Sequence, residues 1–191
     1  MDPQWNLLLT TIQAHLTEKS PLLLAIDGPC CAGKSTLAQR LRGRFDCTVF
    51  HMDDFFLPPS IATAQRLAIP GGNVHWERVR DSILLPLTNG QRRITFRPYS
   101  CHSMTLSDPV TQSVTPLVVL EGSYSMHPQL RSYYDLTCFL TVSDAVQLQR
   151  LQQRDPDAVP TFQKRWIPLE NRYFAACQVQ QACDLVLSLQ G

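Results

Sequence analysis

Short, almost wholly apolar segments alternate with longer segments of mixed polarity along the chain. A continuous apolar run of about five to seven residues is typical of a strand that is buried on both faces of a parallel sheet. Such a run needs no alternation, because neither of its faces meets water. Runs of this kind predict strands at residues 22–26, 47–52, 116–122, 136–142 and 184–189.

Apolar residues at helical spacing between these runs predict helices. In the first one, Pro3 suits the first helical turn and Asp2 the N-cap position before it. Ser143 is expected to cap a later helix. Pro86 and Pro168 are expected to stop or break two others, because proline lacks the N–H of a helix interior. The predicted helices cover residues 3–18, 35–45, 75–90, 143–154 and 161–183.

The alternation of strands and helices predicts an α/β fold with three layers: a five-stranded parallel sheet flanked by helices, with a small hairpin and lid insertion. Residues 57–74 are loop-rich, and residues 92–100 read as a short strand, one arm of a hairpin. With 191 residues, we expect a single domain over 1–191. Within it we expect the N-terminal helix at 3–18, a substrate-side insertion at about 57–115 and a lid at about 150–165.

Three of the predicted strands end at polar groups: Asp27–Gly28, Asp53–Asp54 and Glu121–Gly122. In open parallel sheets, ligands gather beyond the carboxyl ends of the strands. The sequence therefore predicts a polar site at this edge of the sheet.

The stretch GPCCAGKS, between the first strand and the next helix, fits the phosphate-binding loop G-x-x-x-x-G-K-S. Gly28 and Gly33 permit the backbone angles and close approach that a cradled phosphate needs. The helix that follows offers unpaired N–H groups and the positive end of its dipole. The strand before the motif and the helix after it are the context that this motif requires, and they indicate a P-loop nucleotide-binding fold.

Within this loop, Lys34 is expected to reach the β- and γ-phosphates. The Ser35 hydroxyl is expected to ligate Mg²⁺, and Thr36 to contact the α-phosphate. The expected nucleotide contacts are Gly28, Cys30, Cys31, Ala32, Gly33, Lys34, Ser35 and Thr36.

The net charge and the cysteine content limit the expected binding partners and the cellular compartment. The net charge of +1 gives no case for nucleic acid or an anionic membrane, and no apolar run reaches the length of a membrane span. Seven cysteines without a C-x-x-C pair, and an N-terminus unlike a signal peptide, lead us to expect a reducing cytoplasm. The pattern leaves open whether Cys30 and Cys31 have a redox role.

Three further stretches resemble uridine kinases: HMDDFFLP (51–58), VVLEGSYSMHPQLRSYYDLTCFLTV (118–142) and RLQQRD (150–155). The resemblance runs from about Leu22 to Leu187 and is closest to the bacterial uridine-kinase-like proteins of the uridine kinase and phosphoribulokinase superfamily. It implies transfer of the ATP γ-phosphoryl group to a hydroxyl, often the 5′-hydroxyl of a nucleoside.

The resemblance also implies residue roles. Asp53 matches the carboxylate that accepts the proton of the attacking hydroxyl and lies near the metal, although Asp54 is an alternative base. Glu121 matches the second carboxylate of the family, which contacts Mg²⁺ and the substrate; the alternative is that Glu121 caps a turn. Arg150 and Arg154 match a lid that covers the phosphates, or else they form a solvated helix face.

On the acceptor side, Tyr99 in FRPYS resembles a tyrosine that contacts the nucleobase, with packing on a hairpin as its alternative. The chain departs from the family in GGNVHWER, where His75 stands in place of an expected aspartate; a histidine there can still hydrogen-bond a hydroxyl. The acceptor therefore stays open between a nucleoside and another hydroxyl compound of the pantothenate, glycerate or nicotinamide riboside type.

Together these features predict a phosphotransferase with ATP and Mg²⁺ as cofactors and a small alcohol as acceptor. A nucleotide-binding regulatory protein without turnover is the alternative from another class. The sequence leaves open whether the chain forms a homo-oligomer.

Overall fold

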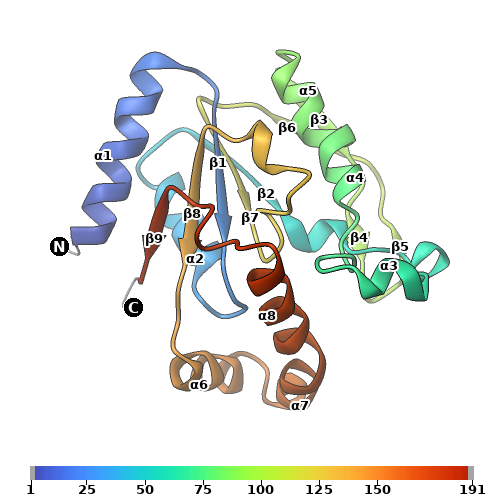
Figure 1. The fold of residues 1–191 in the computed structure, drawn as a ribbon. Coiled ribbons are helices and arrows are strands. Elements are labelled where there is room, and N and C mark those ends of the chain that lie inside the picture. Colours follow the sequence, from blue (N-terminus) through green and yellow to red (C-terminus); the bar gives the residue numbers. More distant parts are fainter. Residues whose placement is uncertain (1–2, 189–191) are drawn as a thin grey trace.

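The computed structural model describes residues 3–188 and shows a five-stranded sheet between layers of helices (Figure 1). The strands run parallel in the order β2-β7-β1-β8-β9. The predicted α/β fold and its five central strands are thus confirmed, while Asp2 and Leu189, at the outer ends of two predicted elements, lie outside the described residues. The strands are β1 (Leu22–Asp27), β2 (Cys47–His51), β7 (Leu117–Glu121), β8 (Leu136–Leu140) and β9 (Leu185–Leu187).

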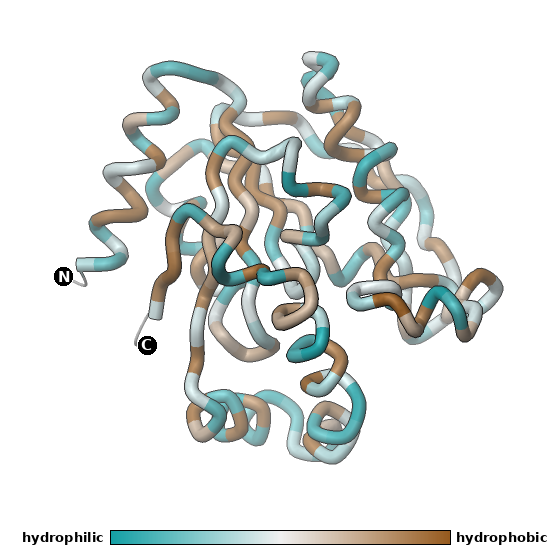
Figure 2. Tube along the Cα trace, in the orientation of Figure 1, coloured by the Kyte–Doolittle hydropathy of each residue, from teal (hydrophilic) through white to brown (hydrophobic). Residues whose placement is uncertain are grey.

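The central strands are buried on both faces, as their continuous apolar runs predict. In β1, Leu22, Leu24 and Ile26 belong to one hydrophobic cluster. Leu23 and Ala25 belong to a second cluster on the opposite face, because side chains alternate along a strand. Figure 2 shows the resulting concentration of apolar residues along the sheet. Burial of each large aliphatic side chain contributes about 1.5–3 kcal/mol.

Different helices cover the two faces of the sheet. The first cluster includes Trp5 and Leu8 of α1 and Leu37 of α2. The second includes Ile83, near the middle of the 76–88 helix, and Tyr173 of α8. Among residues 3–188, no helix is long and apolar enough to cross a membrane. The α-helices are α1 (Pro3–Glu18), α2 (Lys34–Arg42), α3 (Ala64–Ala68), α4 (Trp76–Val79), α5 (Leu85–Thr88), α6 (Asp144–Arg154), α7 (Val159–Thr161) and α8 (Ile167–Ala176).

The expected helix breaks at Pro86 and Pro168 are wrong. The helical turns continue past each proline, and a π-helical segment precedes it, η3 (Arg80–Leu84) before Pro86 and η6 (Phe162–Trp166) before Pro168. A wider π turn shifts the hydrogen-bond register, which accommodates a residue without an N–H inside the helix.

Helix boundaries otherwise follow local chemistry. The Ser143 hydroxyl accepts a hydrogen bond from the Val146 N–H, which confirms the predicted cap of α6. The last predicted helix ends at Ala176 rather than at residue 183, and Gln178 has a left-handed φ of 48° that ends helical geometry. Short 3₁₀ turns connect other elements: η1 (Met52–Phe55), η2 (Pro59–Ile61), η4 (Arg131–Tyr133) and η5 (Pro156–Ala158).

The segment between β2 and β7 contains two small antiparallel pairs, the short helix α3, the helical stretch from α4 to α5 and two 3₁₀ turns. The predicted hairpin arm at 92–100 is confirmed, since β3 pairs with β6 and β4 with β5. Helix α3 lies inside the stretch predicted as loop, and the Thr63 hydroxyl caps it by accepting the Arg66 N–H. The strands are β3 (Arg93–Phe96), β4 (Tyr99–Ser100), β5 (Thr105–Leu106) and β6 (Val110–Ser113).

Candidate functional site

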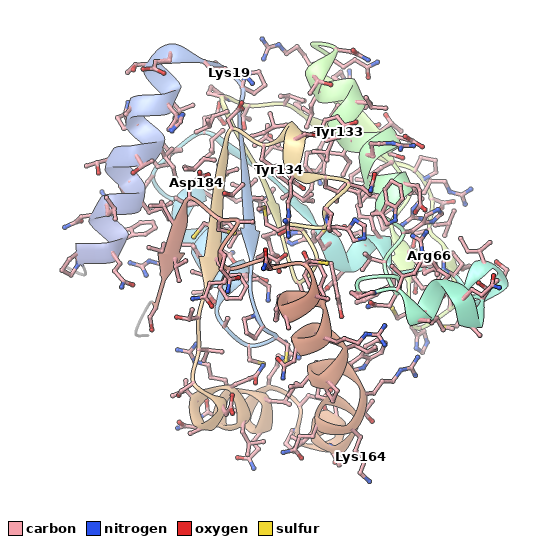
Figure 3. The ribbon with its side chains drawn as sticks, in the orientation of Figure 1. Lys19, Arg66, Tyr133, Tyr134, Lys164 and Asp184 are labelled. Atoms are coloured by element: carbon pink, nitrogen blue, oxygen red, sulfur yellow. The ribbon has the colours of Figure 1, made fainter. Side chains whose placement is uncertain are left out.

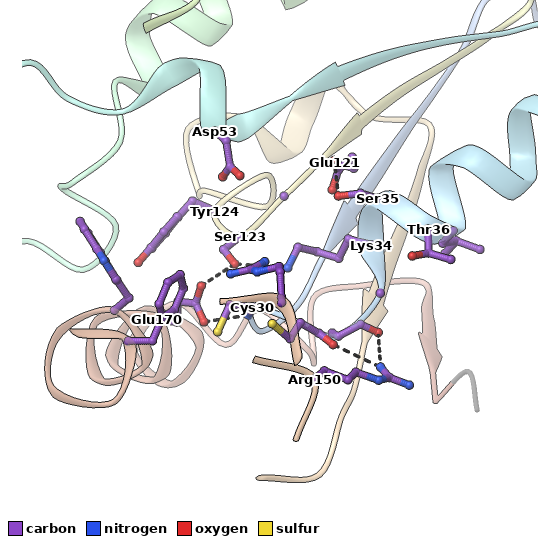
Figure 4. A pocket seen from close by; sticks show the side chains of 18 of the residues that line it. Cys30, Lys34, Ser35, Thr36, Asp53, Glu121, Ser123, Tyr124, Arg150 and Glu170 are labelled. Carbon is purple, nitrogen blue, oxygen red and sulfur yellow. Dashed lines mark hydrogen bonds between the residues drawn. The ribbon is translucent and has the colours of Figure 1, made fainter. Parts of the chain in front are cut away.

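A cavity of about 760 Å³ lies at the carboxyl edge of the sheet, where the polar strand ends were predicted to meet (Figure 4). Its floor is the loop after β1, and α6 and α8 close it from beyond the strand ends (Figure 1). The cavity thus collects side chains from segments that lie far apart in the sequence, including the loop after β1, η1, the end of β7 and the helices from α6 to α8. The lining residues are 30–37, Arg40, Asp53, Phe56, Cys101, 121–124, Arg150, Arg154, Phe162, Trp166 and Glu170.

Glycines give the loop its sharp turn. Gly28 has a φ of 143° and Gly33 a φ of 101°, both in the region that favours glycine. A Cβ atom on Gly28 would lie 2.4 Å from the carbonyl oxygen of Leu140 in β8. The loop therefore needs glycine at its first position for space as well as for backbone angle.

Asp27 fixes the start of the loop and is fully buried. Its carboxylate accepts the backbone N–H groups of Gly28 at 2.7 Å and Met126 at 2.8 Å, and the Tyr173 hydroxyl at 2.9 Å. Burial raises the pKa of Asp27 to about 6, although these hydrogen bonds oppose the shift. Asp27 thus joins β1, the turn after β7 and α8 beneath the cavity.

The Lys34 side chain is almost fully buried and folds back over the loop. Its Nζ donates to the carbonyl oxygens of Gly28 at 2.8 Å and Pro29 at 2.7 Å, and to Ser123 Oγ at 3.4 Å. These contacts place a positive charge on the inner side of the loop (Figure 4).

Oxygen donors gather opposite this lysine. Ser35 Oγ donates to Glu121 Oε1 at 2.9 Å, and His51 Nδ1 lies 2.6 Å from the same oxygen. The hydrogen bond to Glu121 raises the pKa of His51. The Asp53 carboxylate points into the cavity (Figure 4), and burial, together with the nearby Glu121, raises its pKa against the pull of Lys34.

This donor set fits Mg²⁺, which prefers oxygen ligands and retains several waters. The Glu121 carboxylate is buried and already touches the Ser35 hydroxyl, and Asp53 faces the same cavity. Asp54 lies outside the cavity lining; both aspartates belong to the 3₁₀ turn η1 rather than to strand β2, so strand alternation is not the reason that they differ. No group of three or more metal-ligating His, Cys, Asp or Glu side chains occurs in the described part of the chain.

Both predicted lid arginines reach the site. Arg150 Nη1 donates to the carbonyl oxygens of Cys31 at 3.2 Å and Ala32 at 3.4 Å, so it supports the loop from α6 (Figure 4). The Arg154 guanidinium lies 5.3 Å from the centre of the Phe162 ring, and both residues line the cavity. A purely solvated helix face is therefore excluded for Arg150.

Sequence reasoning missed two buried residues that hold the loop. Gln147 Nε2 donates to the Cys30 carbonyl oxygen at 3.0 Å and to Cys30 Sγ at 3.2 Å. Glu170 of α8 accepts the Cys30 N–H at 2.9 Å and the Ser123 hydroxyl at 2.8 Å. Gln147 and Arg150 are three residues apart on one helix face, a spacing that could have indicated a shared target.

The structure places two predicted acceptor residues outside the cavity lining. Tyr99 is a buried residue of β4 in the β4–β5 pair, and its hydroxyl donates to Met104 Sδ at 3.5 Å, which agrees with the packing alternative. Nδ1 of His75 is buried without a hydrogen-bond partner at the start of α4. From the same insertion, Cys101 lines the cavity instead.

The fold is that of known P-loop kinase-like structures. A possible uridine kinase from Bacillus stearothermophilus matches with a TM-score of 0.66 and 20% identity, covering 95% of this chain and 99% of that one. A provisionally assigned fructose transport system kinase from Silicibacter sp. TM1040 matches with a TM-score of 0.67 and 21% identity, covering 93% and 97%. No protein-family model and no curated protein sequence matches the chain. At these identities the likeness establishes the fold.

Proposed function

We propose that the chain is a kinase that transfers the γ-phosphoryl group of ATP to a hydroxyl of a small molecule, with a nucleoside as the first candidate. The observation that carries the proposal is the juxtaposition of the phosphate-binding loop with Asp53 and Glu121 in one cavity. A loop alone binds a nucleotide, whereas a loop faced by carboxylates can also position and deprotonate an acceptor.

The triphosphate binds along the loop in this proposal. Its negative charge draws the Lys34 ammonium away from the Gly28 and Pro29 carbonyls, which it contacts in the described structure. The N–H groups from Cys31 to Thr36 surround the β-phosphate, and Arg150 keeps the loop carbonyls turned outward. Arg154 lies near enough to neutralise charge that spreads over the transferring phosphoryl group.

The residues that would hold Mg²⁺ are Ser35, Asp53 and Glu121. When bound, the ion neutralises charge on the phosphate oxygens. The His51 ring hydrogen-bonds Glu121 and so holds that carboxylate in position.

Asp53 is the proposed general base. Burial raises its pKa, which makes its carboxylate a better proton acceptor at neutral pH. It takes the proton of the acceptor hydroxyl as the oxygen attacks the γ-phosphorus, and the leaving group is ADP.

An aromatic wall supports a planar acceptor. Phe56 and Trp166 have ring centres 6.0 Å apart, and they line the cavity together with Tyr124 and Phe162. Such rings favour a nucleobase or another flat group. The neighbour that is termed a possible uridine kinase agrees with a nucleoside, whereas the neighbour that is provisionally assigned to fructose transport keeps a sugar as the second candidate.

A coupled ADP-release screen over nucleosides, sugars and hydroxyl-bearing vitamins tests the proposal. We expect acceptor-dependent ADP release from the wild-type chain, loss of about a hundredfold or more in Asp53→Asn, and a much smaller loss in the matched control Asp54→Asn. Undiminished turnover in Asp53→Asn would refute its role as base. ATP binding without turnover for every acceptor would favour a regulatory protein instead.

A further inference from the structure

The phosphate-binding loop carries two adjacent thiols that the proposed transfer does not use. Cys30 is buried, whereas Cys31 is half-buried in the cavity wall. The backbone of Cys31 has a left-handed φ of 59°, which residues other than glycine seldom adopt. The loop therefore holds a cysteine at a position where backbone preference favours glycine.

Dedicated contacts orient this pair. Gln147, itself buried, donates from Nε2 to Cys30 Sγ at 3.2 Å. Because the Cys30 sulfur accepts this bond, its own S–H remains available to donate, and the Cys31 thiol is its neighbour along the loop. A thiol that donates to its neighbour stabilises a thiolate on that neighbour.

Charged groups from three helices act on the same sulfur. Lys34 of α2 and Arg154 of α6 favour the Cys31 thiolate, and Glu170 of α8 opposes it. The adjacent Cys30 thiol and the two cations lower the pKa of Cys31 against the effect of burial. The pKa of Cys30 is raised by its pairing with Cys31 and by burial. Cys31 thus combines access to the cavity, cationic neighbours and an adjacent thiol, which characterise reactive thiols.

We propose that Cys31 is a modification site for low-molecular-weight disulfides and that the adduct blocks nucleotide binding at the phosphate-binding loop. The thiolate attacks one sulfur of a disulfide RS–SR. A new S–S bond joins Cys31 to one RS group, the original S–S bond breaks, and the other half leaves as RS⁻ and takes a proton from water. The consequence for nucleotide binding rests on the proposed function, whereas the exchange itself does not.

Cys101 provides a comparison within the same cavity. It lies in the exposed turn between β4 and β5, and partial desolvation together with the nearby Asp53 carboxylate raises its pKa. The wild-type chain is incubated with glutathione disulfide in the absence of nucleotide, and adducts are quantified by peptide mass spectrometry. At pH 6 we expect Cys31 to react about tenfold faster than Cys101, because its larger thiolate fraction outweighs its lower nucleophilicity. The preference should shrink toward pH 9, where Cys101 also ionises. Equal labelling at pH 6, or a preference that does not change with pH, would overturn the site.

Two variants test the site and its consequence. Cys101→Ser should retain the adduct, and Cys31→Ser should lose it; a Cys31→Ser chain modified as fast as wild type contradicts the assignment.

In the wild-type chain, the adduct should weaken binding of a fluorescent ATP analogue about tenfold or more, and dithiothreitol should restore it. In Cys31→Ser, binding should be the same with and without the disulfide. An adduct on Cys31 that leaves nucleotide binding unchanged would refute the block of nucleotide binding while the modification stands. A lack of nucleotide binding before any treatment would instead refute the proposed function.

Discussion

The two halves of the cavity differ in how they are built. In the loop half, Lys34, Gln147 and Arg150 all donate hydrogen bonds to atoms of the loop itself. The half that the proposed function assigns to the acceptor, called the acceptor half below, includes the ring pair of Phe56 and Trp166. The loop half is thus one continuous segment held by hydrogen bonds from neighbouring side chains. The acceptor half is a surface formed by aromatic side chains that are far apart in the sequence.

This difference separates the expected effects of substitutions. Where hydrogen bonds are buried, removal of one partner lowers the free energy of unfolding, because the remaining polar group is left buried and unsatisfied. An aromatic wall that faces a cavity contributes less to folding and more to what the cavity holds. Changes in the loop half should therefore alter stability and nucleotide binding, and changes in the acceptor half should alter acceptor binding.

The largest effect is expected for Gly28→Ala. The added Cβ would meet the Leu140 carbonyl oxygen at 2.4 Å, and the φ of 143° is strained for alanine. We expect a loss of about 2–4 kcal/mol in the free energy of unfolding, measured by urea denaturation. Gly90→Ala is the matched control: its φ is also positive, at 79°, but no atom lies within 4 Å of its added Cβ. A loss no larger in Gly28→Ala than in Gly90→Ala would show that space at the loop is not limiting.

The next effect concerns Asp27, whose pKa burial raises to about 6 from an ordinary 3.8. Near pH 5 the folded state retains a proton that the unfolded chain has largely released, so folding stability from this group is present at low pH and is lost as pH rises to about 6. Relative to Asp27→Asn, the wild-type chain should lose about 2.4 kcal/mol of unfolding free energy between pH 4 and pH 7. Denaturant titrations of both chains across this range measure it. A relative gain for wild type over the same range would mean that hydrogen bonds outweigh burial.

A smaller effect is expected in the acceptor half. Trp166→Ala removes one ring of the pair with Phe56. Loss of a stacking surface of this kind should raise the acceptor KM about tenfold while the KM for ATP changes less than about twofold. Steady-state kinetics with each substrate varied in turn separate the two constants. An equal rise in both would assign Trp166 to the fold of the whole site rather than to the acceptor.

The smallest effect is expected for Tyr99→Phe. Its hydroxyl contacts Met104 sulfur, a weak acceptor, and the side chain lies outside the cavity lining. Unfolding free energy should change by less than about 0.5 kcal/mol, and the acceptor KM should stay constant. A clear rise in acceptor KM would return Tyr99 to the substrate side.

The sequence predicted the sheet and the loop because both depend on local pattern. Continuous apolar runs such as Leu22–Ile26 are typical of a doubly buried strand, and the spacing from Gly28 to Lys34 is set by the geometry of one turn. The contacts of Glu170 and Gln147 depend on how α8 and α6 pack over that loop, and no local pattern encodes them. The helices that continue past Pro86 and Pro168 likewise depend on π segments, which the apolar spacing of the sequence does not predict.

Equilibrium titration with Mg–ATP tests the central claim most directly, using wild type, Lys34→Ala and a matched control. Lys164 suits the control because its side chain is exposed and points away from the body of the molecule (Figure 3). We expect wild type and Lys164→Ala to bind ATP with the same affinity, and Lys34→Ala to bind about tenfold more weakly or worse, since a phosphate contact from a buried ammonium is lost. No binding by wild type, or equal binding by all three chains, would contradict the account.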